Sequence, residues 1–278
     1  MLKNYALKVL NKSLEQDIGF FDVSTEIFGN KEGRAIILAK EKCVLCGIDF
    51  IKEFFESYNL KCKKLANDGD LVFGEILEIE GKIKDILLLE RTALNFLMHL
   101  SGVSTKTYNI IQKVREVNKN VRIAGTRKTL PLLAPLQKYA IYIAGGDTHR
   151  FRLDDCIMIK DNHIKAFGMR DAIKKVREKV SFTKKIEVEV NNFTELKIAL
   201  EEKVDIVMLD NFKPKDVCRA LNIINNFYKE TSYRPIVEVS GGINEDNILE
   251  YAKYKVDVIS LGCLTHSVKA VDMSLDIV

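Results

Sequence analysis

Positive charge is concentrated around one short apolar run in the middle of the sequence. Residues 144–164, AGGDTHRFRLDDCIMIKDNHI, place two histidines, two arginines and a lysine on either side of the run CIMI. Such a run is typical of a buried strand, and a protein interior tolerates ionised side chains only where an opposite charge or a good hydrogen-bond partner meets them. The sequence therefore predicts that a ligand supplies the missing partner.

Five cationic side chains are expected to form one group: Arg127, Lys128, His149, Arg150 and Lys160. They fall at predicted strand ends or in the loops that follow. Arginine meets a carboxylate with two parallel hydrogen bonds, whereas lysine acts as a point charge. A salt bridge at the rim is the alternative for any one of them, but five together favour an anion-binding site.

Two carboxylates lie at the ends of neighbouring apolar runs, Glu189 in KIEVEV and Asp210 in DIVMLD. A pair of carboxylates can hold Mg²⁺, directly or through water, or bind ribose hydroxyls. Glu187 shares the face of Glu189 because side chains alternate along a strand, so it could also point inward. Helix caps or salt bridges are the alternative role for these acids.

Glycines follow the last two apolar runs, in VSGGI (residues 239–243) and LGCLTHS (residues 261–267). Glycines let backbone N–H groups approach an anion, and a helix predicted to begin at Thr265 would add its positive end. Ordinary glycine turns at strand ends are the alternative. Their occurrence on both of the last two strands favours a phosphate site.

The elements that position these residues begin near residue 121, where short apolar runs alternate with helix-like stretches. The runs are VRIAGT, DCIMIKD, KIEVEV, DIVMLD, PIVEVSGG and DVISLG, with AIYIAGG as a candidate seventh strand. This alternation favours parallel βαβ units, whose carboxyl-end edge carries the active site in a (β/α) barrel. The sequence predicts an incomplete barrel of about seven strands; a doubly wound open sheet would use the same edge.

The first 105 residues follow a different pattern. An amphipathic helix is followed by alternating runs such as RAIILAK and LVFGEILEIEG, which predict a small antiparallel sheet with helices. Residues 90–114 then have helical apolar spacing, with an interruption predicted near Gly102. His99 lies among the apolar residues of this segment, and we expect a core histidine with a satisfied hydrogen bond.

Composition excludes several classes of protein. The net charge is +4 and the basic residues are scattered, so no nucleic-acid partner is expected. No run of 18 apolar residues or signal peptide is apparent, so we expect no membrane partner and a cytoplasmic location. Cys43 and Cys46 lack a second ligand pair at zinc-site spacing, and we interpret them as small buried hydrophobes.

Seven segments together resemble the quinolinate phosphoribosyltransferase family: LERTALNFLMHLSG, TRKT, GGDTHRFRLDDCIMIKDNHI, EVEV, MLDN, VSGGI and SLGCLTHSVKAVDMSLDI. The resemblance implies an α/β fold, with an N-terminal α/β sandwich domain (residues 1–105, completed by 267–278) and an open α/β barrel (residues 106–266). It also implies the reaction of quinolinate with 5-phosphoribosyl-1-pyrophosphate to give nicotinate mononucleotide, pyrophosphate and CO₂. Mg²⁺ is implied, with no organic cofactor.

The resemblance assigns roles to matching positions of this sequence. For quinolinate, these are Arg91, Arg127, Lys128, His149, Arg150 and Lys160, with Lys128 also catalytic. Glu189 and Asp210 would be catalytic and would serve the metal and the ribose. Phosphoribosyl pyrophosphate would further use Thr126, Ser240, Gly241, Gly242, Gly262, Cys263, Leu264 and His266. Arg91 would reach the site of a partner subunit, which implies a homodimer or a higher even oligomer.

Three positions depart from the usual family pattern: Gly125 replaces an acidic residue, Thr148 replaces an asparagine, and Phe20-Phe21 replace a turn with glycine. None removes a charge that the chemistry needs. Rival interpretations are a related protein of molybdenum-transport operons, which should lack the full cation set, and a barrel lyase or aldolase with Lys160 as its Schiff-base lysine. A non-catalytic ligand-binding barrel would not need Glu189 and Asp210 as well as the cations.

Overall fold

The protein is described by a computed structural model that covers residues 1–25 and 30–278. Contacts between Cα atoms divide the chain into two compact units. The first unit comprises Met1–Asn109, Thr129–Gly145 and Leu264–Val278, and the second comprises Ile110–Lys128 and Gly146–Cys263. Residues 129–145, which the sequence analysis places within the barrel, therefore belong by contact to the first unit. The domain limits at residues 105 and 266 stay a prediction.

The first unit contains a four-stranded antiparallel sheet with the order β10-β1-β3-β2. Its strands are β1 (Glu32–Val44), β2 (Lys61–Lys64), β3 (Leu71–Lys82) and β10 (Met273–Ile277). Ala35, Ile37 and Ala39 of β1 are buried on one face, as the two-residue alternation predicts. The strand near the C-terminus, β10, pairs with β1 from Ala35↔Ile277 to Ala39↔Met273.

Four helices accompany this sheet: α1 (Leu2–Ile18), α2 (Ile48–Glu56), α3 (Ile83–Arg115) and α4 (Ala134–Ile143). The longest, α3, passes from the first unit into the second without a break, so the predicted interruption near Gly102 is wrong. A Cβ atom at Gly102 would lie 2.4 Å from the backbone oxygen of Lys269. This glycine therefore permits a close approach of the chain and does not end the helix.

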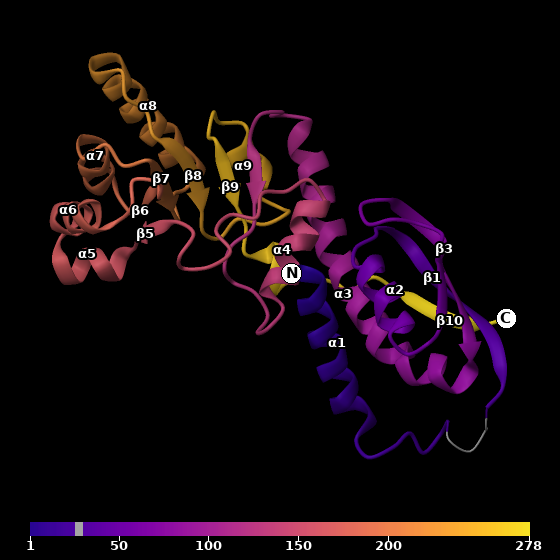
Figure 1. The fold of residues 1–278 in the computed structure, drawn as a ribbon. Helices are drawn as coiled ribbons and strands as arrows, with labels where there is room; N and C mark the ends of the chain where they lie inside the picture. The colour runs from indigo at the N-terminus through magenta and orange to yellow at the C-terminus, as the bar shows by residue number, and fades with distance from the viewer. Residues whose placement is uncertain (26–29) are drawn as a thin grey trace. The chain divides into compact units, whose positions relative to one another are not determined.

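The second unit contains a six-stranded parallel sheet with the order β4-β9-β8-β7-β6-β5 (Figure 1). Its strands are β4 (Arg122–Ala124), β5 (Ile157–Ile159), β6 (Ile186–Val190), β7 (Ile206–Asp210), β8 (Ile236–Ser240) and β9 (Val258–Ser260). The helices are α5 (Asp161–Phe167), α6 (Met169–Lys179), α7 (Phe193–Glu201), α8 (Pro214–Thr231) and α9 (Ile248–Ala252), and α10 (Cys263–His266) leads back to the first unit. The predicted mixed α/β fold with an open parallel barrel sheet is confirmed.

The seventh strand predicted in AIYIAGG is wrong, because this run forms the end of α4. Asp147, shortly after this run, forms a single parallel bridge with Ala124 at the edge of the sheet beside β4. Leu136, Ala140 and Ile141 are fully buried, and their spacing is that of a helix. Six strands and one bridge therefore stand in place of the seven strands expected.

No helix within residues 1–25 and 30–278 combines the length and the apolar character needed to cross a bilayer.

Candidate active site

The carboxyl ends of the parallel strands bring the predicted acids and cations of the second unit together. Lys160 follows β5 directly, and its Nζ lies 2.7 Å from Oε2 of Glu189 on β6. Asp210 ends β7, where it pairs in register with Ser240 of β8. Parallel strands point their carboxyl ends to one edge, so this arrangement follows from the topology.

The two predicted carboxylates interact electrostatically. Burial raises the pKa of Asp210, and the negative charge of Glu189 raises it further. The hydrogen bond from Asn211 and the charges of Lys160 and Lys128 act in the opposite direction. Glu189, Lys160 and Lys128 therefore all lie within electrostatic reach of Asp210.

Asn211 holds one of these carboxylates in place. Its Nδ2 donates to Oδ2 of Asp210 at 2.7 Å, and its backbone N–H donates to the oxygen of Ser240 at 2.9 Å. Gly241 has a φ of 92°, and a Cβ atom there would lie 2.4 Å from Oδ1 of Asn211. The glycine predicted for anion binding is thus also required by the packing of Asn211.

The remaining cations lie in three places. Arg150 donates from its guanidinium to the oxygen of Cys156 at 3.2 Å and contacts the sulfur of Met158 at 3.4 Å, at the start of β5. Arg127 is exposed in the loop after β4, and no ion pair to it is found within residues 1–25 and 30–278. Arg91 belongs to the first unit, where it lies exposed on α3, 3.7 Å from Glu90.

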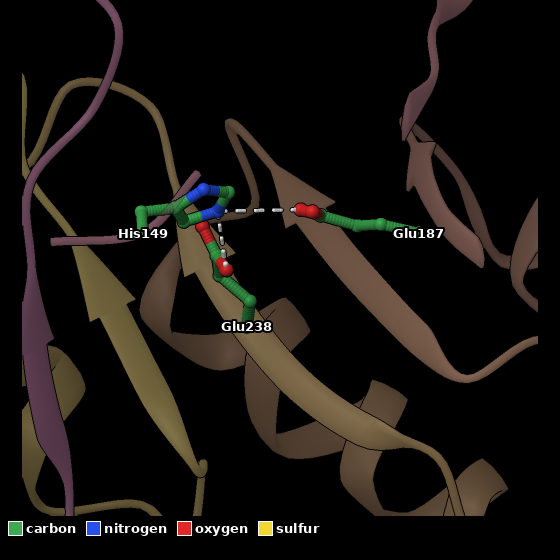
Figure 2. Close-up of side chains that lie close together, drawn as sticks. All are labelled: His149, Glu187 and Glu238. Carbon is green, nitrogen blue, oxygen red and sulfur yellow. Dashed lines mark hydrogen bonds and ion pairs between the residues drawn. The ribbon is translucent and has the colours of Figure 1, made fainter. Parts of the chain in front are cut away.

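Three ionisable side chains, His149, Glu187 and Glu238, lie close together (Figure 2). The two glutamates lie within β6 and β8, two residues before the carboxyl end region that carries Glu189 and Ser240. Nε2 of His149 lies 3.1 Å from Oε2 of Glu238 and 3.7 Å from Oε1 of Glu187. The side chains of Glu187 and Glu238 are only 1% and 3% exposed. Glu187 points inward, as its alternation with Glu189 predicts.

The pKa values of His149 and Glu187 both depart from their usual range. Burial lowers the pKa of His149, but hydrogen bonds and charges from Glu187 and Glu238 outweigh it and raise the value to about 10. Burial raises the pKa of Glu187; the charge of Glu238 adds to this effect, while His149 opposes it. A proton within this group is therefore held strongly.

Glu238 is not among the site residues that the sequence patterns predict. The signal was available, since PIVEVSGG repeats the alternation of KIEVEV, with Glu238 two residues before Ser240 as Glu187 lies two residues before Glu189. Two-residue alternation places both members of each pair on one face of their strand.

The predicted phosphate-binding residues divide between the two units. Ser240 is hydrogen-bonded through its Oγ to Ser260 at 2.9 Å, and Gly242 has a φ of 64° in the turn that follows. The helix expected to begin at Thr265 begins at Cys263 and is only four residues long. Leu264 and His266 belong to the first unit, while Gly262 and Cys263 belong to the second.

The positions that depart from the family pattern either form hydrogen bonds with the backbone or are exposed. Gly125 is buried and donates its N–H to the oxygen of Asp147 at 2.9 Å. Thr148 donates from its hydroxyl to the oxygen of His149 at 3.1 Å. Phe20 and Phe21 are both exposed.

His99, Cys43 and Cys46 are side chains of types that can bind metal, but each is packed at least partly in the protein interior. His99 is half-buried and hydrogen-bonded to Gln137 at 3.0 Å, and burial lowers its pKa, as expected for a core histidine. Cys43 and Cys46 are fully buried free thiols, and burial raises the pKa of both. High thiol pKa values disfavour the thiolate that metal binding requires.

Comparison with known proteins identifies the family. The family described as quinolinate phosphoribosyl transferase matches with its N-terminal domain over residues 22–101 and with its C-terminal domain over residues 103–276. A probable nicotinate-nucleotide pyrophosphorylase (carboxylating) of Methanocaldococcus jannaschii is 65% identical, over 100% of this chain and 99% of the relative. A relative of the same description from Methanothermobacter thermautotrophicus is 42% identical over 98% of each chain.

Solved structures agree with the sequence comparisons. The nicotinate-nucleotide pyrophosphorylase of Francisella tularensis superposes with a TM-score of 0.92 at 34% identity, over 99% of this chain and 97% of that protein. The fold is thus shared over nearly the whole chain, and the two family domains together match residues 22–101 and 103–276. This chain belongs to the quinolinate phosphoribosyl transferase family.

Proposed function

We propose that this chain is a carboxylating nicotinate-nucleotide pyrophosphorylase of NAD biosynthesis. It joins quinolinate to 5-phosphoribosyl-1-pyrophosphate and releases nicotinate mononucleotide, pyrophosphate and CO₂. The observation that carries the proposal is the convergence of Lys128, Lys160, Glu189 and Asp210 at one sheet edge in a chain of this family. Cations for a dicarboxylate and carboxylates for a sugar and a metal are both present there.

Quinolinate carries two carboxylates, and the cation group supplies the charge to meet them. The proposed contacts come from Arg127, Lys128, Arg150 and Lys160, with His149 as part of the group and Arg91 supplied by a partner subunit. Lys160 is paired with Glu189. A substrate carboxylate would therefore share or replace this ion pair.

Glu189 and Asp210 fit a magnesium ion together with the ribose hydroxyls. Mg²⁺ prefers carboxylate oxygens, and these two carboxylates repel each other enough for Glu189 to raise the pKa of Asp210. A bound cation would relieve that repulsion, and it would neutralise charge on the leaving pyrophosphate. Residues proposed for the phosphates are Thr126, Ser240, Gly241, Gly242, Gly262, Cys263, Leu264 and His266.

The mechanism follows from the charges of the chain. Positive charge develops on the ribose as pyrophosphate leaves, and the fixed carboxylates of Glu189 and Asp210 stabilise it. Lys128 and Arg150 orient the pyridine so that its nitrogen attacks the sugar carbon. The positive charge of the alkylated ring nitrogen then stabilises the electron pair that stays on C2 when the bond to the 2-carboxylate breaks, so CO₂ departs without an organic cofactor. A proton from solvent adds to C2 and gives nicotinate mononucleotide.

One assay tests the proposed function. The purified protein is mixed with quinolinate, phosphoribosyl pyrophosphate and Mg²⁺, and nicotinate mononucleotide and labelled CO₂ from the 2-carboxylate are measured. Formation of both products in equal amounts supports the proposal. Absence of both, from folded protein, overturns it.

Removal of divalent metal is expected to abolish turnover. Protein treated with EDTA and returned to metal-free buffer should lose nearly all activity, and added Mg²⁺ should restore it, because the carboxylate pair and the pyrophosphate both need a neutralising cation. Rates are compared with equal ionic strength supplied by KCl, which controls for general screening. Full activity of the metal-free protein would contradict the roles assigned to Glu189 and Asp210.

A homodimer or a higher even oligomer is proposed, in which Arg91 completes the partner's site. Mixing inactive Arg91→Ala and Lys128→Ala chains under conditions of subunit exchange should restore about a quarter of wild-type activity, because half of the dimers are mixed and each has one intact site of two. Lys128→Ala mixed with Lys160→Ala is the matched control. Both residues belong to the second unit of one chain, so this mixture should stay inactive.

Recovery in the control mixture, or none in the Arg91 mixture after exchange is verified by mass, would refute the shared site. A cytoplasmic location with small-molecule substrates, and with neither a nucleic acid nor a membrane as partner, completes the proposal.

A further inference from the structure

The two ring nitrogens of His149 are both engaged by neighbouring groups. Nε2 faces Oε2 of Glu238 at 3.1 Å, and Nδ1 accepts the backbone N–H of Arg150 at 2.7 Å. Because a carboxylate accepts hydrogen bonds, the proton of this pair lies on Nε2. The imidazolium form, which the raised pKa of His149 favours, also carries a proton on Nδ1 and would lose the hydrogen bond from Arg150. The neutral ring protonated at Nε2 keeps both contacts.

Each of the two acids beside this ring has one buried oxygen that lacks a hydrogen-bond partner among the described residues. Oε1 of Glu187 and Oε1 of Glu238 are buried and accept no hydrogen bond within the described part of the chain. Buried carboxylates with unsatisfied oxygens are costly, and such groups call for a structural or functional reason. The His149 ring is the group that both of them face (Figure 2).

A metal ion is the alternative occupant of this group, because one donor atom from each residue lies within 4.8 Å of the others. Coordination through Nε2 would move the ring proton to Nδ1. There it would oppose the N–H of Arg150, which already points at Nδ1. The geometry therefore favours a hydrogen-bonded anchor over a metal site.

The ring anchors a segment that is also held from its backbone. His149 has a φ of 53°, a left-handed conformation that is stabilised by its N–H bond to Oδ1 of Asp147 at 2.8 Å. Asp147 is in turn tied to β4, donating its N–H to Ile123 and accepting that of Gly125. Arg150 follows this anchored residue directly in the chain.

We propose that Glu238, assisted by Glu187, is a positioning residue that acts through the His149 ring to fix the segment presenting Arg150 to quinolinate. This inference rests on the proposed function. It assigns His149 a positional role, because Nε2 already faces the buried acids and Nδ1 already meets the Arg150 backbone. Quinolinate is then met by the guanidinium that this anchor holds.

A pair of variants tests the anchor. Glu238→Met keeps most of the buried volume but removes the acceptor, whereas Glu238→Gln keeps an oxygen that can accept from Nε2. We expect Glu238→Met to raise the KM for quinolinate about tenfold or more, the effect of losing a hydrogen bond to a charged group. The KM for phosphoribosyl pyrophosphate should change little, and Glu238→Gln should restore the quinolinate KM to near the wild-type value.

Nitrogen NMR of the ring provides a readout that needs no activity. The chain has four histidines, so the His149 signals can be assigned by their loss in a His149→Gln variant. We expect a proton on Nε2 in the wild-type protein at neutral pH, unchanged when diamagnetic Zn²⁺ is added in the presence of saturating Mg²⁺. A ring protonated only at Nδ1, or a signal shifted by stoichiometric metal, would overturn the proposal in favour of a metal site.

The outcomes separate this inference from the proposed function. Wild-type protein that makes no nicotinate mononucleotide defeats the function, and the NMR measurement still decides how the ring is held. An active wild type whose Glu238→Met variant keeps an unchanged quinolinate KM defeats the inference alone. If Glu238→Met does not fold, the NMR result and the KM of Glu238→Gln decide, since a large rise in KM for the glutamine variant would also overturn the anchor.

Discussion

Arg150→Ala is expected to lower kcat/KM for quinolinate between about 30-fold and several thousandfold, which corresponds to roughly 2–5 kcal/mol for truncating one member of a buried charge pair. The guanidinium lies at the start of β5, held by Cys156 and Met158. Its loss leaves a substrate carboxylate without a bidentate partner. Steady-state kinetics with quinolinate varied at saturating phosphoribosyl pyrophosphate measure the effect.

Arg152→Ala is the matched control for this variant. Arg152 is two residues away on the same segment, but its side chain is 75% exposed and pairs with the exposed Asp154. Exposed ion pairs contribute little, so this variant should keep wild-type kinetics. Arg150→Lys should recover only part of the loss, because an ammonium cannot reproduce the two parallel hydrogen bonds. Equal kinetics for Arg150→Ala and Arg152→Ala would show that Arg150 is only a rim residue.

Nicotinate is expected to be a poor substrate, with kcat/KM at least about 10⁴-fold below that of quinolinate. The reason is that cations placed for two carboxylates would be desolvated by the bound ring yet left unpaired when one carboxylate is missing. Turnover is measured by mononucleotide formation with each pyridine acid at equal enzyme concentration. Comparable turnover of nicotinate would contradict the role of the cation group.

Two unreactive analogues distinguish binding from chemistry in this comparison. Benzene-1,2-dicarboxylate has both carboxylates but no ring nitrogen, so it should compete with quinolinate without being turned over. Benzoate, with one carboxylate, should compete far more weakly. Equal inhibition by the two would show that the second carboxylate is not recognised, whatever the rate with nicotinate.

Sequence patterns predicted the parallel sheet and its chemical edge well, for a physical reason. Glu189 and Asp210 close strands that are otherwise apolar, and parallel strands must bring such ends to one edge. Their proximity therefore followed from topology. The pairing of Glu189 with Lys160 did not, because it depends on side-chain conformations that strand periodicity does not specify.

The errors arose where one local pattern permits two structures. AIYI is rich in β-branched residues and was interpreted as a strand, yet Leu136, Ala140 and Ile141 form the buried face of a helix. Gly102 was interpreted as a helix break, but its role is to admit the backbone of Lys269, which lies far away in the sequence. Glu238 was missed because an acid inside a buried strand is compensated only by a histidine from a distant loop.

The pairing of β10 with β1 has a consequence for how the chain is made. A ribosome completes β1 and β3 long before it reaches Met273–Ile277, which cover the outer edge of β1. Until then, the edge from Ala35 to Ala39 presents unpaired backbone groups, the kind of surface to which another nascent chain can add. Slow translation or premature termination before Met273 would prolong that exposure. Although β10 has only five residues, we therefore expect its loss to increase aggregation during synthesis.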